Sequence, residues 1–185
     1  MNLSKADNVL REIEMMRKRQ FLPIVGPRKG KVLADVIREI KPRRVLEVGT
    51  LIGYSAVLMG KELGSDARLT TIEIHPDEAT VARENIKKAQ ISSKVDVIVG
   101  DAKKVLPKLS GKFDMVFIDA EKTEYLIYLR LIEKRLHKGS VIVADNAGIF
   151  ANEMKDYLDY VRSSGKYSSK YMSFGEDGVE VSTKL

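Results

Sequence analysis

The most constraining feature of the sequence is the segment 45–56, VLEVGTLIGYSA, in which a short apolar run leads into two glycines. Residues 45–48 are apolar except for Glu47, which is typical of a short buried strand. Helix-compatible residues resume at Ser55, so the segment predicts a strand, a tight turn and a helix. Because glycine has no Cβ, a ligand can approach the backbone closely at Gly49 and Gly53. In open α/β sheets such a turn lies at the carboxyl end of a strand, where ligands bind.

The turn does not match the two common phosphate-binding patterns. A dinucleotide fingerprint, G-x-G-x-x-G, would need glycine where Leu51 and Tyr54 stand, and a P-loop would need Gly-Lys-Ser/Thr. A second acid, Glu73, ends the next apolar run, and an acid in that place can accept both hydroxyls of an unphosphorylated ribose. S-adenosylmethionine therefore fits this stretch, with its ribose at Glu73 and its amino-acid end near Glu47. The alternative is an ordinary strand–helix corner with a surface glutamate.

Composition limits the class of protein. The 185 residues are 44% hydrophobic and 31% charged, which fits one globular domain with a sizeable core. Cysteine is absent, which excludes disulfides, thiolate zinc sites and a cysteine nucleophile. With no membrane-length apolar run and no signal-peptide pattern, we expect a cytoplasmic protein that does not enter a membrane. The net charge of +6 permits an acidic partner such as RNA, but the scattered basic residues favour a solvated lysine-rich surface.

Strand and helix patterns alternate along the chain. We expect strands over residues 45–48, 69–74, 95–99, 113–119 and 140–146, and helices over 3–20, 32–40, from 55 onward, 76–90, after 102, 123–136 and 152–163. The segment 21–30 reads as a loop, and 166–185 as a β-hairpin that turns at 175–178. Five strand–helix units favour a parallel, doubly wound α/β sheet with an antiparallel strand at one edge. We divide the single domain, 1–185, into N-terminal helices and a cap loop (1–44), an α/β core (45–164) and the hairpin (165–185).

Four of the predicted strands end in acids, which parallel pairing would align along one edge of the sheet. These acids are Glu73, Asp101, Asp119 and Asp145, and Asn146 follows the last of them. Asp119, Asp145 and Asn146 offer hard oxygen ligands, which suit Mg²⁺ or Mn²⁺ and disfavour zinc. Each aspartate could instead cap a helix, an alternative that is strongest for Asp101.

Lys122 and His75 are further candidates for the same region. Lys122 lies three residues past Asp119, where it could take the proton of a metal-held hydroxyl, or it could be a solvated lysine at a helix start. His75 and His137 have no ligand-like spacing. We expect His75 to line the cofactor side and His137 to lie on the surface.

Several segments together resemble a known family. They are VGPRKG, VIREIKPRRVLEVGTLIGYSAVLM, ARLTTIEIHPDEA, VGDA, FDMVFIDAEKTEY and KGSVIVADNA. In this order and at these spacings, the chain resembles the metal-dependent O-methyltransferases of the catechol and caffeoyl-coenzyme A type from about Leu22 to Tyr160. The resemblance implies a Rossmann-like sheet of seven strands and S-adenosylmethionine as the methyl donor.

The resemblance also assigns roles by position. It places Val25, Glu47, Gly49, Ser55, Glu73, Asp101, Ala102 and Asp119 around the cofactor, and Asp119, Asp145 and Asn146 around the metal. Lys122 matches the family's base, and Tyr125 matches an aromatic near the site, although a core tyrosine fits equally well. Catechol-type members carry a C-terminal acid that holds the second substrate hydroxyl. Its counterpart here is not evident, and Glu176 and Glu180 are the candidates.

We therefore predict an O-methyltransferase that moves a methyl group from S-adenosylmethionine to a hydroxyl of a small, catechol-like acceptor chelated by Mg²⁺ or Mn²⁺. Asp119 and Lys122 are the predicted catalytic residues. A second hypothesis makes a tRNA or nucleoside hydroxyl the acceptor, with phosphates contacted by Arg17, Lys18, Arg19, Arg28, Lys29 and Lys31. A non-catalytic nucleoside-binding protein is a third, and the missing glycines disfavour an NAD-linked oxidoreductase. Related enzymes are often dimers, so a homodimer is a further expectation, although no paired face is evident.

Overall fold

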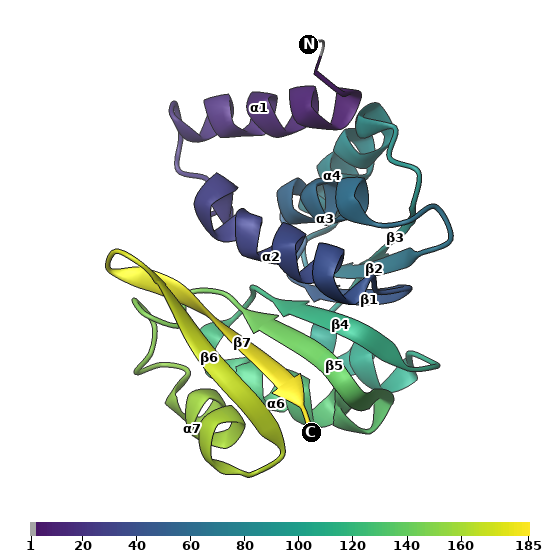
Figure 1. Ribbon diagram of the computed structural model, residues 1–185. Coiled ribbons are helices and arrows are strands. Elements are labelled where there is room, and N and C mark those ends of the chain that lie inside the picture. Colours follow the sequence, from purple (N-terminus) through teal and green to yellow (C-terminus); the bar gives the residue numbers. More distant parts are fainter. Residues whose placement is uncertain (1–2) are drawn as a thin grey trace.

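A seven-stranded sheet organises the computed structural model, which describes residues 3–185 (Figure 1). The strands are β1 (Arg44–Val48), β2 (Arg68–Glu73), β3 (Lys94–Val99), β4 (Phe113–Ile118), β5 (Leu136–Ala144), β6 (Tyr167–Phe174) and β7 (Asp177–Lys184). Their order is β3-β2-β1-β4-β5-β7-β6. The first five strands pair in parallel, and β7 runs antiparallel to both β5 and β6. This confirms the predicted doubly wound sheet, with the hairpin adding two antiparallel strands at one side of the sheet instead of one.

Helices cover both faces of the sheet. They are α1 (Lys5–Arg17), α2 (Gly26–Ile40), α3 (Tyr54–Glu62), α4 (Pro76–Ala89), α5 (Ala102–Val105), α6 (Tyr125–Ile132) and α7 (Lys155–Ser163), with 3₁₀ turns η1 (Leu106–Lys108), η2 (Lys122–Glu124) and η3 (Glu133–Arg135). Successive strand residues point to opposite faces. Val45 therefore packs in the core beneath α1 to α4, and Leu46 in the core against α5 to α7. None of the helices within residues 3–185 is both long and apolar enough to cross a membrane.

The N-terminal helices differ in part from the prediction. A capping box begins α1, in which the Asp7 amide donates to Ser4 Oγ (3.1 Å) and the Ser4 amide donates to the Asp7 carboxylate (3.3 Å). The prediction that α2 begins at residue 32, after a loop over 21–30, was wrong, since α2 begins at Gly26. Pro27 explains the earlier start, because proline's fixed φ suits the first helical turn. Lys29 therefore lies on a helix rather than in a loop.

The boundary between α6 and β5 was also predicted wrongly. The helix expected over 123–136 is broken into η2, α6 and η3, and β5 begins at Leu136 instead of residue 140. Leu136 is buried and pairs with Phe113, after which β5 bulges around Gly139 (φ 88°) before its register resumes at Val141. The helix expected from 152 begins at Lys155.

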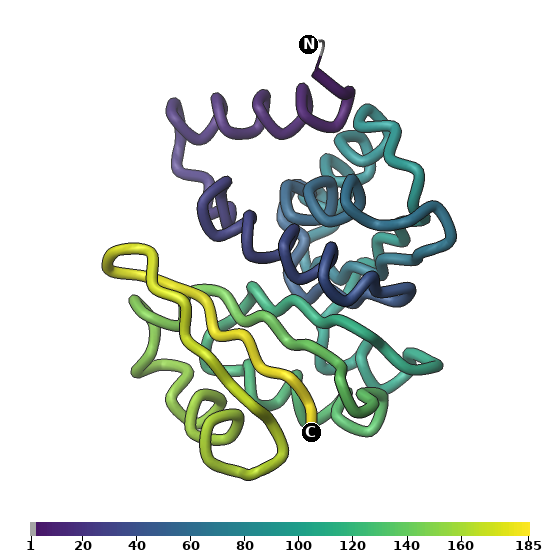
Figure 2. Tube along the Cα trace, in the orientation of Figure 1, coloured from purple at the N-terminus to yellow at the C-terminus, as the bar shows by residue number. Residues whose placement is uncertain are grey.

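The start of α2 and the turn between β6 and β7 meet beside the sheet. The tip of the β6–β7 hairpin lies next to the start of α2 (Figure 2), where Lys29 Nζ is 2.7 Å from an Asp177 carboxylate oxygen. Residues 29 and 177 thus reach one place from opposite ends of the sequence. That place is the edge where the parallel strands end.

Candidate active site

A cavity of about 1220 Å³ lies at the carboxyl ends of β1, β2, β4 and β5. Its lining includes all the predicted site residues except Glu47, namely Val25, Gly49, Ser55, Glu73, Asp101, Ala102, Asp119, Lys122, Asp145 and Asn146. Parallel strands bring these residues together because their carboxyl ends share one edge of the sheet. His75 also lines the cavity, whereas His137 is exposed and pairs with Asp114 on the surface.

The glycine corner after β1 is tightly packed against the end of β4. Gly49 has a φ of 97°, a region that side-chain-bearing residues rarely adopt. A Cβ at this position would lie 2.8 Å from the backbone carbonyl carbon of Asp119. The close neighbour that requires glycine here is therefore the protein's own backbone, and Asp119 is held directly beside the corner.

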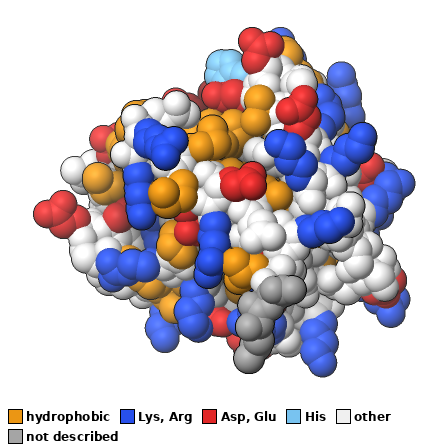
Figure 3. All heavy atoms as spheres, turned by 90° about the horizontal axis from the view of Figure 1, so that it is seen from above, with side chains coloured by type: hydrophobic (Ala, Val, Ile, Leu, Met, Phe, Trp, Pro, Cys, Tyr) orange, Lys and Arg blue, Asp and Glu red, His pale blue; other side chains and the backbone are white. Residues whose placement is uncertain are grey.

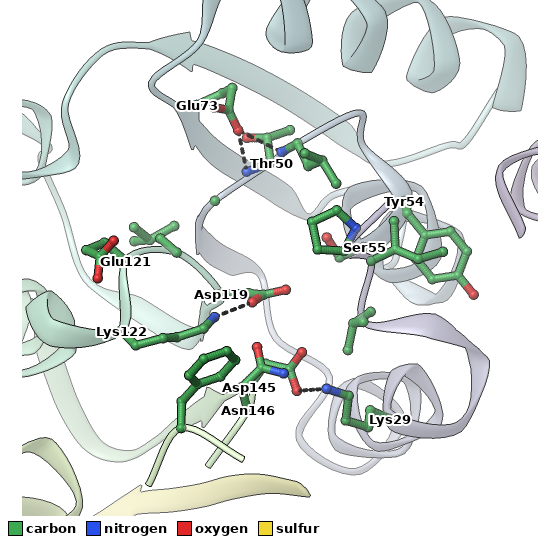
Figure 4. Close-up of a pocket in the computed structure, with 18 of the residues that line it drawn as sticks. Lys29, Thr50, Tyr54, Ser55, Glu73, Asp119, Glu121, Lys122, Asp145 and Asn146 are labelled. Carbon is green, nitrogen blue, oxygen red and sulfur yellow. Dashed lines mark hydrogen bonds and ion pairs between the residues drawn. The ribbon is translucent and has the colours of Figure 1, made fainter. Parts of the chain in front are cut away.

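Glu73 points toward the glycine corner (Figure 4). One of its carboxylate oxygens accepts hydrogen bonds from the amides of Thr50 (3.1 Å) and Leu51 (2.7 Å), and the other accepts from the amide of His75 (2.9 Å). The side chain is only 5% exposed. These bonds hold the β1 and β2 ends in one arrangement, with the carboxylate at the cavity wall.

Glu47 lies beneath the cavity instead of lining it. One of its carboxylate oxygens accepts a hydrogen bond from Ser55 Oγ, and its other oxygen has no hydrogen-bond partner among the described residues. Complete burial raises the pKa of Glu47 to about 8. Ser55 is therefore the part of this pair that reaches the cavity.

Lys122 links Asp119 to Tyr125, a buried aromatic residue below the site. Its Nζ donates hydrogen bonds to Asp119 Oδ1 and to the Tyr125 hydroxyl, both at 2.9 Å. The Tyr125 ring is fully buried, and its hydroxyl donates to the backbone carbonyl of Asp145 at 3.3 Å. Tyr125 is thus both a core residue and the support of Lys122, so the two interpretations of this residue are combined.

Asp145 is 2% exposed and is surrounded by charges. Burial, and then the negative charge of Asp119, raises the pKa of Asp145 to about 7. Lys29 Nζ lies 2.6 Å from Asp145 Oδ1, and the same ammonium is 2.7 Å from Asp177. Burial alone would raise the pKa of Asp177. Hydrogen bonds from Lys29, the Gly178 amide and Asn146 outweigh burial and lower this pKa to about 2.

Comparison with known proteins places this site in a family. The model of the O-methyltransferase family matches residues 3–161. Catechol O-methyltransferase B of Danio rerio is 38% identical over 182 residues, which cover 91% of this chain and 68% of that protein. The chain belongs to the O-methyltransferase family. Catechol O-methyltransferase of Sus scrofa is 37% identical over 169 residues, covering 84% of this chain and 90% of that protein.

This O-methyltransferase also shares its fold with solved family members. The O-methyltransferase TomG from Streptomyces achromogenes, determined in complex with SAM, matches 100% of this chain and 91% of its own with a TM-score of 0.86 at 25% identity. The prediction that the protein is an enzyme of this family is confirmed.

Sequence reasoning missed two residues of the O-methyltransferase site, Lys29 and Asp177. The RNA hypothesis grouped Lys29 with the basic residues that would contact phosphates, yet it is turned into the cavity and paired with two carboxylates. Asp177 is the C-terminal acid that reaches the site. Of the two candidates named above, Glu176 is exposed and Glu180 is buried in an ion pair with Arg162. The available signal for Lys29 was its place in the VGPRKG segment.

Two groups of side chains in this O-methyltransferase have the chemistry of a cation site. Asp119, Asp145 and Asn146 lie on one side of the cavity (Figure 4), and they already draw in two lysine ammonium groups. Glu73, His75 and Glu78 place ligand atoms within 4.8 Å of one another. The first group fits a hard divalent cation better, because the Glu73 oxygens already accept three backbone hydrogen bonds.

Proposed function

We propose that this enzyme transfers a methyl group from S-adenosylmethionine to a hydroxyl of a small, catechol-like acceptor held at a Mg²⁺ or Mn²⁺ ion. The observation that carries the proposal is the position of Asp119. Its backbone packs against the glycine corner, and its carboxylate accepts a hydrogen bond from Lys122. One residue thus joins the proposed donor and acceptor halves of a single cavity.

The donor half consists of the glycine corner and the acids around it. The position of Glu73 at the cavity wall supports its proposed role as a hydrogen-bond acceptor for the ribose, because about one of its four acceptor positions remains beside the three backbone bonds. Asp101 caps α5 through the Lys103 amide (2.9 Å) and, with Ala102, lines the same half. The SAM complex of the similar protein TomG supports the choice of cofactor.

The acceptor half would hold the metal through Asp119, Asp145 and Asn146. Burial of Asp145 beside Asp119 supports this, because two neighbouring carboxylates out of water are stabilised by a cation. A divalent ion bound there would lower the pKa of an acceptor hydroxyl and would fix the orientation of that hydroxyl toward the methyl donor. Apolar side chains of the cavity, namely Phe21, Ile149, Phe150 and Phe174, favour an aromatic acceptor.

Lys122 is the proposed base that removes the proton of the acceptor hydroxyl. In the proposed reaction Lys122 acts as the neutral amine, the form that burial and a nearby divalent cation favour. The acceptor hydroxyl gives its proton to the lone pair of Lys122 Nζ, which becomes an ammonium, and the hydroxyl oxygen forms a bond to the methyl carbon as the carbon–sulfur bond breaks. The sulfur keeps the electron pair, so the products are a methyl ether and S-adenosylhomocysteine. Tyr125 and Asp119 hold the Lys122 amine in place through two hydrogen bonds of 2.9 Å. Positioning of the two substrates supplies much of the acceleration.

Asp145→Ala tests the acceptor half. We expect labelled-methyl transfer to a catechol to be abolished, while calorimetry shows S-adenosylmethionine binding nearly unchanged. Asp159→Ala, an exposed aspartate on α7, is the matched control and should keep activity. Turnover by Asp145→Ala in the presence of EDTA would exclude the metal role.

The same assay separates the acceptor classes. Catechols, caffeoyl thioesters and bulk tRNA are offered with and without Mg²⁺, and a catechol or caffeoyl substrate is expected to be methylated. Arg17 and Arg28 line the cavity, but basic side chains are spread among acidic and hydrophobic ones on the face seen in Figure 3. Methylation of tRNA alone, lost steeply with added salt, would instead support the RNA acceptor.

A further inference from the structure

Asn146 poses a problem of orientation at the proposed metal site. Its amide carries an oxygen that can bind a cation and an NH₂ group that cannot, and a half-turn of the side chain exchanges them. Asn146 lies two residues past the end of β5 and has a φ of 62°, so the backbone there is in the left-handed region. A contact outside β5 must therefore determine which end of the Asn146 amide faces a metal ion.

Asp177 determines the orientation of the Asn146 amide in the structure. The Asn146 NH₂ group donates to Asp177 Oδ2 at 2.8 Å. An ionised carboxylate only accepts hydrogen bonds, so it binds the NH₂ end of the amide and leaves the carbonyl oxygen free. Hydrogen-bonded partners of this kind commonly orient metal ligands in proteins.

Asp177 is itself fully engaged. Oδ2 also accepts a hydrogen bond from Lys29 Nζ (2.7 Å), and Oδ1 accepts from the amides of Gly148 (3.4 Å) and Ile149 (3.2 Å). These contacts use about four acceptor positions, which is the capacity of a carboxylate. Asp177 is therefore placed to orient Asn146 and has little capacity left to hold a metal ion or a substrate hydroxyl itself.

The contact depends on a close approach of the hairpin to the loop after β5. The Ala147 amide donates to the Gly178 carbonyl at 3.0 Å, and a Cβ on Gly148 would lie 2.9 Å from the Cα of Asp177. Only glycine at position 148 lets the hairpin come this near. The C-terminal hairpin is therefore built into the site and is more than an edge of the sheet.

We infer that Asp177 is a positioning residue that holds the Asn146 side chain with its carbonyl oxygen available to the divalent metal. The inference rests on the proposed metal site. Lys29 contributes by bridging Asp177 and Asp145. Its ammonium group balances the negative charge that Asp177 adds beside the site.

Asp177→Asn tests the inference, because an amide at position 177 no longer provides an acceptor-only partner. Mn²⁺ binding to the S-adenosylmethionine-loaded enzyme is measured by electron paramagnetic resonance of the free ion. We expect the Mn²⁺ affinity to fall about 10- to 100-fold. The affinity for S-adenosylmethionine, measured by calorimetry without metal, should stay within about twofold. Glu176→Gln, the exposed neighbour, is the matched control and should bind Mn²⁺ like the parent.

The exchange variant Asn146→Asp/Asp177→Asn separates orientation from simple loop support. A carboxylate at position 146 has two equivalent oxygens, so one can accept from the new amide while the other remains for the metal. We expect the double variant to regain Mn²⁺ affinity to within about threefold of the parent. Unchanged affinity in Asp177→Asn, or a loss that the exchange does not restore, overturns the inference.

Mn²⁺ binding by the parent and by Asp145→Asn tests the proposed metal site separately from the role of Asp177. If the parent enzyme binds no Mn²⁺, or if Asp145→Asn binds it as well as the parent does, then the proposed metal function is wrong and the inference falls with it. If the parent binds Mn²⁺ and Asp145→Asn does not, the result for Asp177→Asn decides the inference alone.

Discussion

Gly49 and Asp119 are in backbone contact, and the contact leaves no room for a side chain at position 49. A Cβ there would lie 2.8 Å from the Asp119 carbonyl carbon. Since Asp119 carries the proposed link between the donor and acceptor halves, the packing of this pair sets the spacing of the whole cavity. The contact lies just past the end of the parallel pairing between β1 and β4, whose last pair is Val48 with Ile118.

Gly49→Ala should therefore be strongly destabilising. It combines a clash with the Asp119 backbone and a φ of 97° that alanine disfavours, so we expect a loss of about 3 kcal/mol or more in the free energy of unfolding. Gly165→Ala is the control, because Gly165 has a φ of 72° with nothing within 4 Å of the added Cβ. It should cost about 1–2 kcal/mol from backbone strain alone. Urea unfolding of the two variants measures the difference, and equal losses would contradict the packing argument.

Lys122 should be needed for proton removal and not for its charge alone. Lys122→Arg keeps a positive charge beside Asp119, but a guanidinium does not give up its proton in proteins. We expect kcat for methyl transfer to fall about 10²- to 10⁴-fold in Lys122→Arg and in Lys122→Met. The affinity for S-adenosylmethionine should hardly change.

The control for this pair is Lys104→Met, an exposed lysine that does not line the cavity. Steady-state kinetics with saturating cofactor and metal provide the measurement. If Lys122→Arg retains full activity, the side chain acts only through its charge, and the base is another group.

Stability should fall with rising pH because of Glu47. Its pKa in the folded protein is raised from 4.5 to about 8 by burial, so between these values the folded state holds a proton that the unfolded state has lost. The contribution of this group is fully present below about pH 4.5 and is lost as the pH rises through about 8. We expect a slope on the order of 1 kcal/mol per pH unit within this window.

Glu47→Gln isolates that contribution, because glutamine does not titrate and can still accept the hydrogen bond from Ser55. Urea unfolding at pH 5, 6.5 and 8 should show the decline in the parent and a flatter profile in the variant. Parallel pH profiles for the two proteins would show that Glu47 is ionised in the folded state at neutral pH.

The sequence predicted the fold well wherever local patterns sufficed. Apolar runs ending in acids placed β2, β4 and the end of β5, and with them the edge of the sheet where Glu73, Asp119 and Asp145 gather. The errors fell at boundaries. Gly26 begins a helix because Pro27 suits its first turn, and Leu136 begins a strand because it pairs with Phe113 across a bulge, a contact between distant residues that periodicity does not encode.

The sequence by itself determined which strands end in acids, because period-two and period-3.6 patterns are local, and parallel pairing then aligns those acids along one edge. Only the tertiary structure decided that Lys29 and Asp177 join them, and that Glu47 lies beneath the cavity while Ser55 reaches it. Lys29 and Asp177 are 148 positions apart, and their contact depends on the helix start at Gly26 and on the hairpin's approach to Gly148. Such contacts arise from packing between whole elements, for which a single sequence carries no local signal.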